Sequence, residues 1–130
     1  MTAYRAEIIA VGTELLLGNV ANTDAQFLSE MLASVGVDVL YHTAVGDNPA
    51  RLREVVDIAR GRANLLVFTG GLGPTYDDMT KQTVCEAFGL GLEFHPEIAE
   101  EIRHYFDTVF RREMPACNLQ QAYLPRGCTV

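Results

Sequence analysis

Short apolar runs alternate with amphipathic segments along the whole of this 130-residue chain. Runs that are rich in β-branched residues, or that alternate in polarity, are typical of strands. Three of them predict strands, at residues 6–11, 37–45 and 64–70. We expect a further strand to open at the end of the chain, after the Pro-Arg-Gly turn at 125–127.

The segments that follow the first two strands carry apolar residues at helical spacing. Residues 24–35 predict a helix with Thr23 as its N-cap and Gly36 behind it. Its apolar positions are Phe27, Leu28, Met31, Leu32 and Val35. Residues 49–60 predict a second helix, which Asn48 caps, Pro49 begins and Gly61 ends. Its apolar stripe comprises Leu52, Val55, Val56 and Ala59.

Three further helices are expected in the second half of the chain. The first has about ten residues and ends near Phe88. The second spans residues 95–113, with glutamates in its first turns and arginines in its last turn, which suits the helix dipole. The third is short and precedes the turn at 125–127.

The alternation of strand and helix predicts an α/β fold with three layers, in which helices cover both faces of a mostly parallel sheet. No linker divides the chain, so residues 1–130 are expected to form a single domain. Because the chain stops as a strand opens, we expect it to be truncated at the C-terminus, as a fragment of a longer protein.

The formal net charge of −7 disfavours nucleic acid or an anionic membrane as the main partner, since both attract clustered lysine and arginine. The three cysteines show no paired or metal-binding spacing, which favours a reducing compartment. The N-terminal segment is interrupted by Arg5, Glu7 and Glu14 and does not resemble a signal peptide or a membrane span. A cytoplasmic location is therefore expected.

Carboxylates occur in all three loops that follow the predicted strands, and ligands of parallel sheets collect at that edge. The third loop, TGGLGPTYDDMT at 69–80, is the most distinctive. Gly70, Gly71 and Gly73 allow the backbone amides to approach and surround an anion. Asp77 and Asp78 would repel a bare phosphate, but a divalent cation between the two would bind both. The loop thus predicts a magnesium–phosphate site.

A purely structural interpretation of this loop stays open. Glycine turns often follow strands, and an aspartate at a helix N-terminus is stabilising by about 0.3–1 kcal/mol without a ligand. Two known phosphate motifs are excluded, because the loop has no Gly-Lys-Ser/Thr and Tyr76 replaces the third glycine of a dinucleotide fingerprint.

Four segments together resemble the N-terminal domain of the competence-damage-inducible CinA family, which belongs to the molybdopterin-binding group with MogA and MoeA. They are VGTELLLGNVANTDAQFLSEML, VGDNPARL, TGGLGPTYDDMT and NLQQAYLPRG, and the match runs in order from about residue 7 to residue 127. The resemblance implies metal-dependent hydrolysis of ADP-ribose to AMP and ribose 5-phosphate, with Mg²⁺, Mn²⁺ or Co²⁺ as cofactor. It also implies a family segment beyond residue 130, and Asp24 stands where the family usually has Asn.

The resemblance assigns roles that each have a structural alternative. Asp78 would be the principal metal ligand, and Asp77 a second ligand or the group that orients water. Glu14 would be the general base or support the metal, unless loop amides merely satisfy it. The remaining candidates would contact phosphate, ribose or pterin, or only shape turns and caps: Thr13, Asn22, Asp47, Asn48, Thr75 and Thr80.

Three interpretations of the function therefore remain. The first is a hydrolase that acts on a nucleoside diphosphate sugar, and the second is a module that binds molybdopterin or a nucleotide without hydrolysis. The third is a regulatory or assembly domain whose pocket no longer catalyses a reaction. His42, His95 and His104 do not recur at ligand spacing and are expected to be structural. The aromatic and apolar residues at 105–110 are expected in the core or in the contact of a dimer or trimer.

Overall fold

The computed structural model describes residues 3–18 and 20–130 of the chain. Its centre is a parallel sheet of three strands in the order β2-β1-β3, formed by β1 (Arg5–Val11), β2 (Asp38–Val45) and β3 (Leu65–Thr69). The helices of this part are α1 (Thr13–Leu16), α2 (Thr23–Ser34), α3 (Pro49–Arg60) and α4 (Thr80–Ala87). All three predicted strands are present, each within one residue of its expected start and end.

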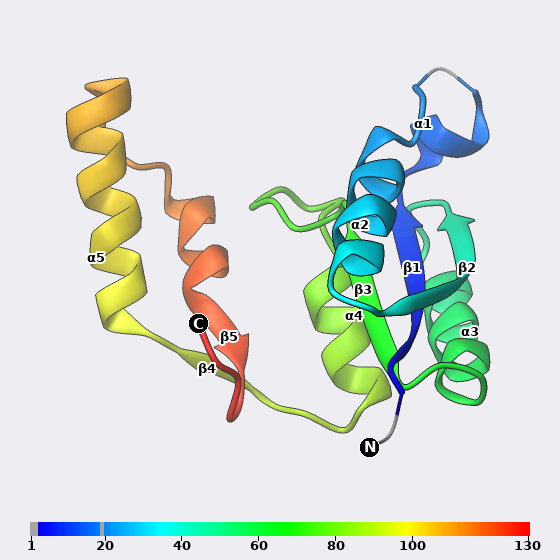
Figure 1. Ribbon diagram of the computed structural model, residues 1–130. Helices are drawn as coiled ribbons and strands as arrows, with labels where there is room; N and C mark the ends of the chain where they lie inside the picture. Colours follow the sequence, from blue (N-terminus) through cyan, green and yellow to red (C-terminus); the bar gives the residue numbers. More distant parts are fainter. Residues whose placement is uncertain (1–2, 19) are drawn as a thin grey trace.

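The residues from Gly91 to Val130 form a smaller part, the small lobe, which an extended segment joins to α4 (Figure 1). It contains β4 (Leu92–Phe94), α5 (Pro96–Tyr105), the π-helical turn η1 (Phe106–Phe110), the 3₁₀ helix η2 (Ala116–Ala122) and β5 (Tyr123–Pro125). β4 and β5 pair antiparallel. The expected strand after residue 127 is wrong, because β5 ends at Pro125, the first residue of the Pro-Arg-Gly turn, and residues 128–130 form no strand.

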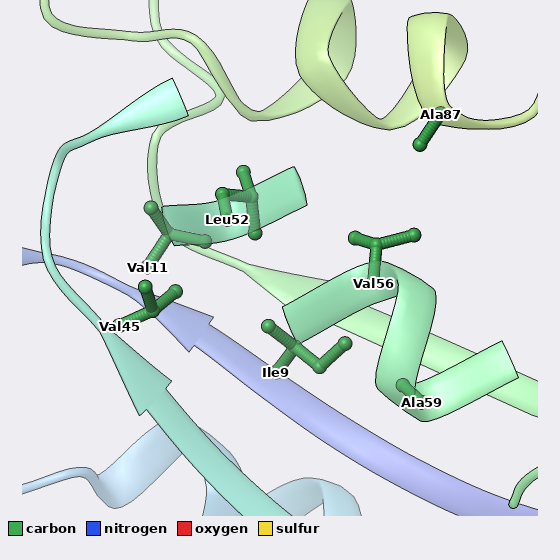
Figure 2. Close-up of a cluster of buried hydrophobic side chains, with 7 residues drawn as sticks. All are labelled: Ile9, Val11, Val45, Leu52, Val56, Ala59 and Ala87. Carbon is green, nitrogen blue, oxygen red and sulfur yellow. The ribbon is translucent and has the colours of Figure 1, made fainter. Parts of the chain in front are cut away.

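Helices cover both faces of the parallel sheet, which confirms the three-layer prediction. On one face, Ile9 and Val11 of β1 pack with Leu52 and Val56 of α3 (Figure 2). Successive side chains of a strand point to opposite faces, so Ile8 lies on the other side of β1. His42, the register partner of Ile8, is hydrogen-bonded to Ser29 of α2 at 2.6 Å, and α2 therefore covers that second face.

The helix signals of α3 are confirmed in detail, whereas those of α2 are only partly right. Asn48 Oδ1 accepts from Arg51 N at 3.0 Å, and Gly61 ends the helix. In α2 the N-cap is Asn22 rather than Thr23. Only part of the expected apolar stripe of α2 is packed, because Leu28 and Leu32 are half-buried whereas Phe27 and Val35 are 61% and 71% exposed.

The helix expected at 95–113 changes geometry in its second half. α5 ends at Tyr105, the chain continues as η1, and Arg111 follows in the left-handed region with φ 51°. Phe106 is buried in this segment, whereas Val109 and Phe110 are exposed. Across residues 3–18 and 20–130, no helix has both the length and the hydrophobicity that crossing a membrane requires.

A buried carboxylate on β1 links the sheet to the segment after α3. Glu7 is 0% exposed, and its Oε1 and Oε2 accept from Arg62 at 2.7 and 2.8 Å. Thr43 of β2 donates to Oε1 at 2.6 Å, and the Arg62 guanidinium stacks 3.8 Å from the centre of the Tyr41 ring. The bonds from Arg62 lower the pKa of Glu7, against the opposing effect of burial. The ionised carboxylate therefore stabilises the fold at neutral pH.

Glu7→Gln should lower the free energy of unfolding at neutral pH by about 1.5–3 kcal/mol, the range for hydrogen bonds to charged groups. Because folding lowers the pKa of Glu7, this stabilisation is complete above the pKa of the unfolded chain. It is lost as the pH falls through the folded pKa. Urea unfolding from neutral to acidic pH should thus show the two proteins converging. Glu54→Gln, an exposed site on α3, is the control, and a gap that does not shrink would contradict the assignment.

Candidate functional site at the carboxyl edge of the sheet

The three loops that were expected to meet do lie at one edge of the sheet. The register pairs Val11 with Val45 and Ala10 with Thr69, so the three parallel strands end side by side. The loop after β3, which we call the glycine loop (Gly70–Met79), leads into α4. Figure 1 shows this loop reaching from the sheet towards the small lobe.

Two glycines of the loop are required by contacts within the chain. Gly70 and Gly71 have φ 82° and 62°, the left-handed region that favours glycine. A Cβ on Gly70 would lie 2.0 Å from the Val11 carbonyl oxygen, and one on Gly71 would lie 2.3 Å from Thr80 Oγ1. The close approach of loop and β1 therefore explains these glycines even without a ligand.

Thr80, the first residue of α4, holds the loop in this position. Its side chain is buried, and its Oγ1 donates to the Gly70 carbonyl at 2.8 Å. Its backbone N–H donates to the Gly71 carbonyl at 3.1 Å. In this structure Thr80 thus braces the glycine loop, rather than presenting its hydroxyl to the solvent.

Asp78 is a half-buried carboxylate that the loop itself supports. Its Oδ2 accepts from Thr75 Oγ1 at 2.6 Å and from Thr75 N at 2.9 Å. The Thr75 hydroxyl, helped by the backbone amides of Thr75 and Gly73, lowers the pKa of Asp78 although burial opposes this. Asp77 is exposed beside it. The loop therefore holds two neighbouring carboxylates, of which Asp78 is oriented and ionised.

A cavity of about 140 Å³ joins the glycine loop to the small lobe. Gly71, Gly73 and Asp78 line it from the loop side. The facing and flanking residues are Lys81 and Gln82 of α4 with Leu92, Gln120 and Tyr123 of the small lobe. The cavity is therefore lined both by residues of the glycine loop that were predicted from the sequence and by residues of α4 and the small lobe that were not.

Glu14 and Asn22 line a second cavity of about 130 Å³ on the other side of Gly70. Asp24 belongs to the same wall, and Thr69 Oγ1 donates to Asp24 Oδ2 at 3.5 Å. Asn22 also caps α2, since its Oδ1 accepts from Ala25 N at 3.3 Å. The structure therefore separates Glu14 and Asn22 from the cavity that Asp78 lines.

Thr13 and Asp47 engage each other where the first two loops meet. Thr13 N donates to Asp47 Oδ2 at 3.2 Å, and Asp47 N donates to Thr13 Oγ1 at 3.1 Å. Asn48 is occupied in capping α3. Thr13 and Asp47 thus join neighbouring loops, and Asn48 caps a helix, in line with the turn and cap roles considered from the sequence for Asp47 and Asn48.

The donors at this edge suit a hard cation. Within residues 3–18 and 20–130, no three carboxylate, histidine or cysteine side chains converge as a metal cage. Mg²⁺ does not need such a cage, because it is commonly held by one or two carboxylates together with substrate phosphates and water. Asp78 lines the cavity and offers the oxygen donors that this pattern requires, whereas Asp77 is exposed beside it and does not line the cavity.

Sequence reasoning missed the cavity residues outside the glycine loop. Lys81 carries a usable signal, because it lies three residues after Asp78 and is the one lysine of the chain. Gln120 and Tyr123 carry no such signal, since their position depends on how the small lobe folds back.

Comparison with known proteins identifies the family. Residues 7–129 match the family described as "Probable molybdopterin binding domain". Two relatives are each named "Putative competence-damage inducible protein": that of Acetivibrio thermocellus is 53% identical over 96% of this chain, and that of Bacillus subtilis is 51% identical over 97%. The chain spans about 30% of the length of either relative.

Solved structures agree with this assignment. A crystal structure of "the protein CinA with unknown function", from Thermoplasma acidophilum, matches with a TM-score of 0.81 at 29% identity. The match covers 98% of this chain and 73% of that one. MoaB from Thermus thermophilus, described as a molybdopterin biosynthesis enzyme, shares the fold with a TM-score of 0.63 at 23% identity, over 94% and 79% of the chains. This chain therefore belongs to the molybdopterin-binding domain family, among the competence-damage inducible, or CinA, proteins.

Proposed function

We propose that the carboxyl edge of the sheet binds the diphosphate of a nucleotide or pterin ligand together with a divalent cation, and that the domain hydrolyses ADP-ribose or a similar nucleoside diphosphate sugar. One observation carries the proposal: Gly71, Gly73, Asp78 and Lys81 line the same cavity. A carboxylate and an ammonium group beside a glycine backbone suit a diphosphate with its counter-cation.

In this proposal, carboxylates hold the cation and backbone amides bind the diphosphate. Asp77 and Asp78 would hold Mg²⁺, Mn²⁺ or Co²⁺, and Thr75 keeps Asp78 ionised and oriented through its two hydrogen bonds. When bound, such a cation polarises the phosphorus and activates water. The Gly73 and Thr75 amides already donate to Asp78, so other amides of the glycine loop would donate to the non-bridging oxygens of the diphosphate.

The size of the cavity decides which part of the ligand it takes. Pockets for whole small-molecule ligands usually measure about 300–1,000 Å³. A cavity of about 140 Å³ is smaller than this range, so it suits the diphosphate rather than a complete nucleotide. The sugar and base would extend out of it along neighbouring surfaces.

Glu14 does not line the cavity that is proposed to hold the diphosphate. It lines the second cavity, which is separate from the first, although the adjacent residues Gly70 and Gly71 each line one of the two. From there it would accept a proton from a water that enters beside the loop. Asn22 lines the same cavity and would contact a ribose hydroxyl.

A second function has independent support. The family description names molybdopterin, and the Thermus thermophilus neighbour is described as an enzyme of molybdopterin biosynthesis. A pterin diphosphate offers the same anionic group to the glycine loop as a nucleotide does. The alternative is therefore a domain that binds molybdopterin or a nucleotide at this edge without hydrolysing it.

Incubation with ADP-ribose distinguishes these two functions. With Mg²⁺, Mn²⁺ or Co²⁺, the chain should release AMP and ribose 5-phosphate, and EDTA should stop the reaction. Chromatography of the nucleotides measures both products. Tight binding of a pterin diphosphate without AMP under any of the three metals would favour the second function instead.

Asp78→Asn should abolish this turnover and leave the melting temperature nearly unchanged, because the amide can still accept from Thr75. It should also weaken Mn²⁺ binding in the presence of pyrophosphate by at least about tenfold, the lower end of what losing a supporting partner of a metal ligand costs. Electron paramagnetic resonance of free Mn²⁺ measures that affinity.

Thr75→Val is the matched control for this experiment, since it removes the hydroxyl bond and keeps the carboxylate. Its effect on Mn²⁺ affinity should be the smaller of the two. Equal losses in both variants would mean that Asp78 only braces the loop, and the metal assignment would then be wrong.

A further inference from the structure

Lys81 is unusual for its type, its surroundings and its position. It is the one lysine in a chain whose formal net charge is −7, and it lies half-buried in the first turn of α4. Lysine side chains are rarely buried unless the ammonium group is paired with an anionic or polar partner. Burial lowers the pKa of the Lys81 ammonium group, which means that the present surroundings do not fully compensate its charge.

The partner of Lys81 in this structure is a neutral carbonyl. Its Nζ donates to the backbone oxygen of Gln120 in the small lobe at 2.6 Å. Among the described residues 3–18 and 20–130, no carboxylate forms a salt bridge with it. An ammonium group has three donors, so Lys81 Nζ can donate to a phosphate oxygen beside or instead of the carbonyl. Lysine is a common phosphate ligand in proteins for this reason.

The Lys81–Gln120 contact also spans the cavity. Within the described part of the chain, it is the one hydrogen bond between residues 3–90 and the small lobe. The small lobe supplies the far wall, where Tyr123 is 43% exposed and its ring lies 5.1 Å from that of Phe94. An aromatic face held by a neighbouring ring is a suitable surface on which a base or pterin can stack.

We propose that the small lobe completes the ligand site: Lys81 neutralises the diphosphate inside the cavity, and Tyr123 stacks against the planar ring that extends from it. This rests on the proposed function, since it takes the cavity at the glycine loop as the diphosphate site. It assigns two recognition tasks to two residues. Lys81 recognises any diphosphate, whereas Tyr123 recognises only a diphosphate that carries a ring.

Calorimetry with two probes tests this division. Inorganic pyrophosphate and ADP-ribose are each titrated into the chain with Mg²⁺ present. Lys81→Gln should weaken the binding of both probes by roughly tenfold or more, and Lys81→Arg should recover most of the loss. Tyr123→Leu should weaken ADP-ribose by roughly fivefold or more and leave pyrophosphate unchanged.

Matched control variants separate these effects from general damage to the small lobe. Arg126→Gln removes a cation that pairs with Glu93 on the surface of the same lobe. Tyr105→Leu removes a tyrosine of the same lobe that is similarly exposed, at 53%. Neither residue lines the cavity, so neither change should alter the binding of either probe.

The single lysine allows a measurement that needs no variant. Lysine labelled with ¹³C and ¹⁵N in the side chain gives one ε-methylene and one ammonium signal, and both should shift when pyrophosphate is added. If the wild-type chain binds the probes but these signals stay fixed and Lys81→Gln binds equally well, this inference is overturned while the proposed function stands. If the wild-type chain binds neither probe with Mg²⁺, both are overturned.

Discussion

The candidate site depends on one steric constraint, the contact between the glycine loop and the end of β1. No side chain fits at Gly70, because a Cβ would lie 2.0 Å from the Val11 carbonyl oxygen. The chain therefore leaves β3 in the left-handed conformation and turns across the end of the sheet. Thr80 fixes the other end of the turn. Asp78 and Lys81 flank that anchored residue, so their positions follow from it.

The charge of the chain constrains how this edge could hold an anion. A protein with a net charge of −7 repels phosphate at long range, and here the cavity wall itself includes the Asp78 carboxylate. The positive charge of a single ammonium group, even with backbone amides beside it, is smaller than the negative charge of a diphosphate. A divalent cation between Asp78 and the phosphates would become the largest local charge and would turn the negative potential of Asp78 into an attractive one for phosphate. The proposals for the metal and for Lys81 are therefore complementary.

The sequence predicted what local patterns determine. The predicted start of α3 at Asn48 and Pro49 and its predicted end at Gly61 were right, because helix caps depend on residues that are close in the sequence. The exposed stripe of α2 was misjudged, since spacing shows that a helix is amphipathic but not which neighbours cover it. β4 was missed because its three residues are ordered by pairing with β5, about thirty positions away in the sequence. The cavity wall at Tyr123 depends on that same long-range pairing.

The glycines of the loop carry less functional information than their number suggests. Gly70 and Gly71 are explained by contacts with Val11 and Thr80, so a glycine-rich turn would be needed at this junction even in a domain that binds nothing. Asp78 is supported within the loop by Thr75, whereas the partner of Lys81 is the neutral carbonyl of Gln120. Ionised Asp78 and partly desolvated Lys81 line the same small cavity, and desolvating charged groups costs stability unless something compensates it. These two side chains, rather than the glycine motif, are therefore the stronger support for a bound diphosphate.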